Sequence, residues 1–85
     1  MRDRLAHRRI MQAKLEIGNR TFESIWHAHI GTAIDEMLRR MPDKLAAIVT
    51  TNPNFWKIED CPGRVTGCIG NTDYIITVSE DYAND

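Results

Sequence analysis

The stretch Ser24–Met41, SIWHAHIGTAIDEMLRRM, is the longest helical pattern in the chain and decides the expected fold. Its apolar residues recur at steps of three and four, a spacing that places them on one side of an α-helix. These residues are Trp26, Ile30, Ala33, Ile34, Met37, Leu38 and Met41. Ser24 suits the N-cap, and Pro42 disfavours α geometry at Met41. The sequence therefore predicts one long amphipathic helix over residues 24–41.

The polar side of this predicted helix carries ordered charges. Asp35 precedes Arg39 by four residues, and Glu36 precedes Arg40 by four residues. Such pairs stabilise an exposed helix by a few tenths of a kcal/mol each. Gly31 costs a helix about 1 kcal/mol relative to alanine. We interpret it as a point of close packing on a neighbouring sheet.

Catalytic and metal-binding patterns are weak in this sequence. His27 and His29 are separated by about 200° around a helix, so they do not readily share a metal ion. Cys61 and Cys68 lack the CxxC spacing of zinc knuckles, and no glycine-rich elbow or phosphate loop accompanies them. We therefore expect no metal, no cofactor and no enzymatic activity.

Composition is that of an ordinary globular chain. Of the 85 residues, 42 % are hydrophobic and 27 % are charged. No apolar run approaches the ~20 residues of a membrane span, and the N-terminus lacks the apolar centre of a signal peptide. Two cysteines are too few for a disulfide framework. We expect a cytoplasmic protein with reduced thiols and no membrane contact.

Residues 13–23, AKLEIGNRTFE, fit two structures. One is a β-hairpin with Gly18-Asn19 as a two-residue turn, in which Lys14 faces Glu23 with opposite charge. The other is a helix that ends at the glycine, followed by a new helix after the asparagine. The hairpin is favoured because the apolar alternation and the turn agree with each other.

Residues 43–51 also leave two structures open. Their first half has a helix-forming composition, whereas the β-branched run Ile48–Thr51 suits a strand. Residues 55–59, FWKIE, alternate as a strand does and place Trp56 and Ile58 on one face.

The last part of the chain predicts a second hairpin. Residues 64–69 and 74–79 read as strands around the loop Gly70–Asp73. Three apolar residues of the final strand share one face: Tyr74, Ile76 and Val78.

Together these patterns predict a single α+β domain over residues 1–85, with a small antiparallel β-sheet packed against the long helix at about 24–41. Residues 1–12 are expected to form a short basic helix or arm, and residues 81–85 a flexible acidic tail. A winged-helix domain is the rival topology. Its recognition helix would be Lys44–Val49, which is almost wholly apolar and offers few groups to base edges.

Charge is distributed unevenly along the chain. Residues 1–20 carry six basic and two acidic side chains, whereas residues 45–85 carry two basic and six acidic ones. This polarity indicates either a charged partner or contact between the two ends of the chain.

These features favour a small non-enzymatic interaction module that occludes or regulates a larger protein. Tryptophan and arginine are frequent anchors of protein interfaces. The predicted partner-binding residues are Arg2, Arg4, Arg8, Arg9 and Trp56. The alternative is a nucleic-acid-binding or transcription-regulating protein that uses the basic N-terminal helix, against which the pI of ≈ 6.3 argues. Homodimerisation is left open.

One segment resembles a known family. Residues 48–55, IVTTNPNF, resemble a segment near the start of a small phage-encoded type I-F anti-CRISPR protein, where a similar string forms a strand and a turn. The resemblance covers eight of the 85 residues. The rest of this chain departs from that family, with a long N-terminal extension and no matching C-terminal helices. The resemblance carries over no binding residue, but it favours a phage-like inhibitor.

Overall fold

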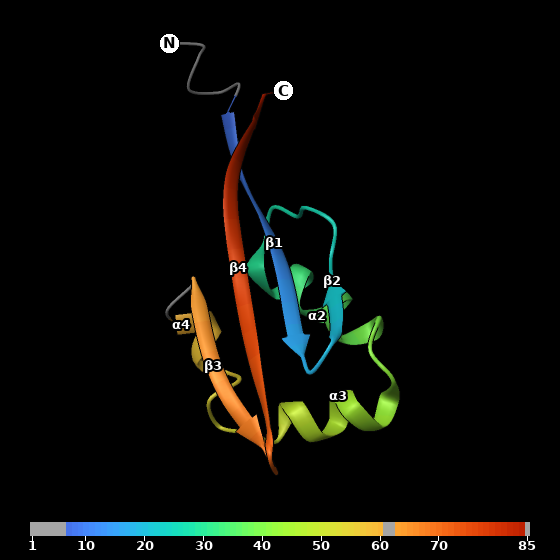
Figure 1. Ribbon diagram of the computed structural model, residues 1–85. Helices are drawn as coiled ribbons and strands as arrows, with labels where there is room; N and C mark the ends of the chain where they lie inside the picture. The colour runs from blue at the N-terminus through green and yellow to red at the C-terminus, as the bar shows by residue number, and fades with distance from the viewer. Residues whose placement is uncertain (1–6, 61–62, 85) are drawn as a thin grey trace.

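The computed structural model describes residues 7–60 and 63–84, which form an antiparallel four-stranded sheet with helices packed on one face (Figure 1). In chain order the elements are β1 (His7–Ile17), β2 (Arg20–Glu23), α2 (Ile30–Arg39), α3 (Asp43–Thr50), α4 (Lys57–Asp60), β3 (Arg64–Ile69) and β4 (Thr72–Asn84). The strand order across the sheet is β2-β1-β4-β3. The first and last described strands are therefore central neighbours.

Both hairpins turn on a Gly-Asn pair. Gly18 and Gly70 have φ angles of 60° and 62° at the first turn position, a conformation that glycine adopts without a steric penalty. The first hairpin is confirmed with its register, because Lys14 lies opposite Glu23. The second turn is shorter than predicted, since β4 already begins at Thr72.

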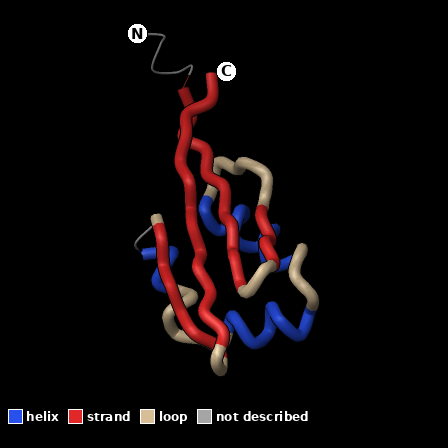
Figure 2. The backbone as a smooth tube through the Cα atoms, viewed as in Figure 1, coloured by secondary structure: helices blue, strands red, loops and turns tan. Residues whose placement is uncertain are grey.

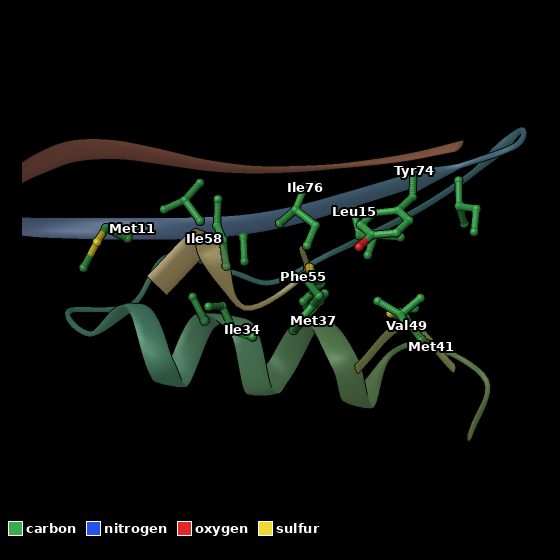
Figure 3. Packing of buried hydrophobic residues seen from close by; sticks show 14 residues of the cluster. Met11, Leu15, Ile34, Met37, Met41, Val49, Phe55, Ile58, Tyr74 and Ile76 are labelled. Atoms are coloured by element: carbon green, nitrogen blue, oxygen red, sulfur yellow. The ribbon is translucent and has the colours of Figure 1, made fainter. Parts of the chain in front are cut away.

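The core lies between the sheet and the helices. Alternate residues of β1 and β4 point to the helical side, as the period of a strand requires. The buried cluster comprises Met11, Ala13, Leu15, Ile17, Ala33, Ile34, Met37, Met41, Val49, Phe55, Ile58, Tyr74, Ile76 and Val78. Figure 3 shows Ile34 and Met37 of α2 beneath Leu15 and Ile76 of the sheet. The grouping of Tyr74, Ile76 and Val78 on one face of β4 is confirmed.

Gly67 makes room for the largest of the fully buried side chains. It lies opposite Tyr74 in the β3–β4 register, and the tyrosine ring is fully buried. A Cβ added at position 67 would overlap the Cζ and Oη atoms of Tyr74. The absence of a side chain at Gly67 therefore decides where this ring lies.

The prediction of one long helix over 24–41 is wrong, because the helix α2 spans only Ile30–Arg39. The preceding residues pair with β1 instead. His27 and Met11 exchange two backbone hydrogen bonds of 2.7 and 2.8 Å. Ser24 does not cap a helix, since its Oγ accepts the Ala13 N–H at 3.0 Å. Tertiary hydrogen bonds have thus outweighed the helical periodicity of this segment.

The predicted basic N-terminal helix is also wrong where the structure describes it. From His7 onward the chain is strand β1, and residues 1–6 lie outside the described residues. At the other end, residues 81–84 continue strand β4 and are not a separate tail. Within the described residues, the segment with Arg8 and Arg9 therefore pairs with the segment that carries Glu80 and Asp81.

Residues 43–51, left open by the sequence, form helix α3 and its C-cap. The hydroxyl of Thr50 donates to the Ala46 carbonyl at 2.9 Å, a contact that a threonine makes readily inside a helix. Val49 is buried, with Leu45 one turn earlier packed against the core. This side-chain packing offsets the strand preference of the β-branched residues.

The strand expected at residues 55–59 is wrong as well. Helix α4 occupies Lys57–Asp60, and Phe55 and Ile58 are the buried residues. Their separation of three residues is that of a helical face. Trp56 consequently points to the surface, away from Ile58. Gly31, interpreted above as a point of close packing, is exposed, and a Cβ added there would meet no atom within 4 Å.

The outer parts of β1 and β4 continue beyond the helices as a two-stranded ribbon, seen at the top of Figure 2. We define the terminal arm as residues 7–12 and 79–84, which include this ribbon and its base, where Met11 still pairs with His27 and packs in the core. The arm gives the protein an elongated shape of 51 × 21 × 20 Å.

Candidate partner-binding surface

Trp56 is exposed but held in place. Trp56 precedes α4 in the chain, and the residue is 41 % exposed. Its indole N–H donates to the Thr50 carbonyl at 2.8 Å, at the C-terminal end of α3. Its ring meets Phe55 edge-on, with centroids 4.7 Å apart and planes at 83°. These two contacts fix the orientation of an apolar side chain at the surface.

An exposed isoleucine accompanies it on the last turns of α3. Ile48 is 48 % exposed, and its carbonyl accepts the Thr51 hydroxyl at 2.7 Å. Both exposed residues lie at the C-terminal end of α3, and we refer to Ile48 and Trp56 as the Trp56 patch. Trp56 is one of the residues predicted from the sequence, whereas Ile48 is not, because the β-branched run around Ile48 suits a strand and does not indicate which residue faces solvent.

The Asn52 side chain connects the loop between α3 and α4 to the sheet through hydrogen bonds. Its Oδ1 accepts the Tyr74 hydroxyl and the Asn54 N–H, both at 3.0 Å. Its Nδ2 donates to the Cys68 carbonyl at 3.1 Å. Burial raises the pKa of the Tyr74 hydroxyl, which therefore stays protonated as a donor. Asn52 thus links the loop between α3 and α4 to strands β3 and β4.

The second tryptophan also lies at the surface. Ile25 is 58 % exposed and Trp26 is 40 % exposed, both in the segment between β2 and α2. Sequence periodicity assigned Trp26 to the buried side of a helix, so this exposure was not foreseen. Both tryptophans of the chain are therefore surface residues.

Glu36 holds the Ile25–Trp26 segment against α2. Its Oε1 accepts the Ile25 N–H and contacts His27 Nε2, each at 2.8 Å. Its Oε2 accepts from Arg40 at 3.0 Å, which is one of the two helix pairs predicted from the sequence. Hydrogen bonds from His27, Ile25 and Arg40 lower the pKa of Glu36 from 4.5 to about 2.

Because the pKa of Glu36 is lower in the folded protein, the stability of the fold depends on pH in the acidic range. A carboxylate with a depressed pKa stabilises the fold above its unfolded value of 4.5, and the contribution is lost as the pH falls towards 2. We expect Glu36→Gln to lower Tm at pH 7 and to melt together with the wild type at pH 2. Thermal melts followed by circular dichroism at several pH values measure this difference.

The matched control is Asp35→Asn, which changes the neighbouring exposed carboxylate. We expect this variant to keep the acid sensitivity of the wild type. A Tm difference between wild type and Glu36→Gln that persists unchanged at pH 2 would contradict the role given to Glu36.

The arginines predicted to bind a partner do not lie next to Trp56 where the structure describes them. Arg8 and Arg9 lie exposed on the terminal arm, whereas Trp56 lies beside α4. Arg9 pairs with Glu80 of β4 at 3.3 Å. Arg2 and Arg4 lie outside the described residues. The structure thus separates the predicted site into an arm and an aromatic patch.

The end of the β3–β4 hairpin forms an open hollow of about 500 Å³. Cys68 lies there, and its thiol donates to the Gly70 carbonyl at 3.1 Å. Partial desolvation and the Asp73 carboxylate raise the pKa of Cys68, the opposite of what activates a nucleophilic thiol. Within residues 7–60 and 63–84, no group of three or more His, Cys, Asp or Glu is placed to hold a metal ion.

Comparison of the chain with protein-family models, curated proteins and solved structures found no match. In the part of the chain that the structure describes, no helix has the length and apolar character to cross a membrane. Both tryptophans are among the exposed large hydrophobic residues of the described surface.

Proposed function

We propose that this protein is a small non-enzymatic binding module, a phage-type inhibitor or regulator that occludes a larger cytoplasmic protein. The observation that carries the proposal is the exposure of both tryptophans, at 40 % and 41 %, in so small a chain. Tryptophan is among the residues most enriched at the energetic centres of protein interfaces. The core is filled by other residues, such as Phe55 and Tyr74.

The fixed orientation of Trp56 favours this patch as the anchor. An interface side chain loses about 0.5–1.5 kcal/mol of rotamer freedom when a partner immobilises it. The hydrogen bond to the Thr50 carbonyl and the edge-on ring contact with Phe55 already restrict Trp56 in the unbound protein. A partner that covers the indole and Ile48 would remove apolar surface from water with little further ordering.

The alternative function, nucleic-acid binding, gains no support from the arm. Phosphate binding requires an excess of positive charge. Arg8 and Arg9 lie on a strand that pairs directly with one carrying Glu80 and Asp81. The described arm therefore carries two arginines and two carboxylates, and its charges balance.

We expect Trp56→Ala to weaken partner binding by about 30-fold, which corresponds to the ~2 kcal/mol typical of an interface hot spot. The measurement has two steps. Immobilised wild-type protein first captures its partner from bacterial lysate, and titration calorimetry then compares the variants with the purified partner.

Lys57→Ala is the matched control, because it truncates the next exposed residue and leaves the indole in place. Trp26→Ala tests the second tryptophan separately. An empty pull-down, or full binding by both tryptophan variants, would overturn the proposal. Binding to mixed DNA at about 150 mM salt that is lost only in Arg8→Glu/Arg9→Glu would favour the alternative.

A further inference from the structure

The outer edge of β4 is open along the terminal arm. Strand β3 covers β4 only from Thr72 to Thr77, and the last bond on that side runs from the Val78 N–H to the Gly63 carbonyl at 2.8 Å. Beyond this point, residues 79–84 have β1 on one side and no described strand on the other.

Backbone geometry shows which groups point into the open space. Successive residues of a strand direct their N–H and C=O groups to opposite sides. The Val78 N–H bonds to Gly63, on the side away from β1. The backbone N–H and C=O groups of Glu80 and Tyr82, two and four residues later, therefore also point away from β1. Met11 lies opposite Glu80, and its backbone N–H and C=O both bond to His27. They therefore do not bond to Glu80, which is consistent with the outward direction of the Glu80 backbone groups.

Tyr82 is the centre of this edge. Its side chain is 60 % exposed, and its outward N–H meets the carboxylate of its own neighbour, Asp81 Oδ1, at 2.8 Å. A two-stranded ribbon is at best marginally stable in water, and open strand edges readily accept a further strand. The arm thus presents an unpaired β4 edge that could accept a further strand.

We propose that the arm is completed by a second copy of this chain, with β4 pairing antiparallel to the partner's β4 about a two-fold axis at Tyr82. In that register Tyr82 faces the partner's Tyr82, and Glu80 faces the partner's Asn84. Asp81 faces the partner's Ala83. No two like charges stand opposite each other, and the two tyrosines form an aromatic cross-strand pair.

Charge and symmetry select this pairing among the edges of the arm. Self-pairing of the β1 edges would bring Arg8 and Arg9 close to their own copies. Pairing β1 with another copy's β4 is a head-to-tail contact, which forms closed rings or open filaments. The β4–β4 contact is isologous and closes as a dimer. Arg9 lies opposite Tyr82 in the β1–β4 register and pairs with Glu80 at 3.3 Å, which offsets part of the negative charge along this edge.

The proposal is independent of the proposed function, because it uses the arm and leaves the Trp56 patch free. Light scattering after size-exclusion chromatography measures the mass over a concentration series. We expect the wild-type mass to double with rising concentration. Tyr82→Pro should remain monomeric, because it removes an N–H that the β1–β4 ladder does not use, and proline is tolerated at strand edges. Tyr82→Phe, which keeps both the N–H and the ring, should still dimerise.

Cysteine cross-linking tests the register in a chain with Cys61→Ser and Cys68→Ser. Hydrogen-bonded antiparallel partners have Cα atoms about 5.5 Å apart, which suits a disulfide. Tyr82→Cys should therefore give a covalent dimer on mild oxidation, whereas Ala83→Cys, facing the partner's Asp81, should not. A wild-type monomer at all concentrations, a dimer that survives Tyr82→Pro, or equal cross-linking at both positions would overturn the proposal. So would a foreign protein bound at this edge in place of the second copy.

Discussion

Gly67→Ala is expected to destabilise the protein by about 3 kcal/mol, the upper range for overpacking a well-packed core. The added methyl group would overlap the Cζ and Oη atoms of Tyr74. The ring has little freedom to move, because it is fully buried and its hydroxyl donates to Asn52. Urea unfolding at pH 7 measures the loss as a shift of the midpoint.

Gly31→Ala is the matched control for this change. No atom lies within 4 Å of a Cβ at that position, and the residue is in helix α2. Alanine there should stabilise the protein by about 0.5 kcal/mol through helix propensity. If both glycine variants shifted the midpoint in the same direction and by the same amount, the tyrosine clash would not be the cause.

Phe55→Ala is expected to cost about 3–5 kcal/mol, since it deletes a fully buried ring and leaves a cavity. A chain of this length has about 4–13 kcal/mol of total stability, so the variant should lose a large share of it and unfold at a much lower urea concentration than the wild type. Circular dichroism and urea unfolding measure the effect.

The adjacent residue provides the contrast. Trp56→Ala removes an exposed ring and one hydrogen bond, so it should cost about 1 kcal/mol and leave the fold intact. Two neighbouring aromatics are thus expected to have opposite roles, one in folding and one in binding. Equal losses of stability in the two variants would contradict this division.

Sequence reasoning succeeded where the signal was local. The hairpin of β1 and β2 followed from Gly18-Asn19 and the flanking alternation, and its register is confirmed. The buried face of β4 followed from three apolar residues at a period of two. In both cases the backbone conformation and the side-chain pattern agree within a few residues.

It failed where distant contacts decide the structure. The hydrogen bonds that draw Ser24 and His27 to β1 join residues far apart in the sequence, and no helical periodicity reports them. Likewise, the start of β1 has a helix-forming composition, and the strand that pairs with it, β4, comes last in the chain. The exposure of Trp56 depends on whether residues 55–59 form a strand or a helix. A strand would place Trp56 on the same face as Ile58, whereas the helical turn places Phe55 with Ile58 in the core and leaves Trp56 exposed.

The central position of β1 and β4 in the sheet has a consequence for how the chain acquires its structure. Residue His7 lies opposite Asn84, so the longest ladder of the sheet forms only after nearly all of the described chain is available. Closing so large a loop costs entropy before any contact compensates for it, and such non-local topologies fold slowly, in milliseconds to seconds. During synthesis, β1 is made long before β4, so its apolar face cannot pair with β4 until the last strand has been synthesised. The first hairpin and helix α2 are therefore the elements available to shield that face until β4 emerges.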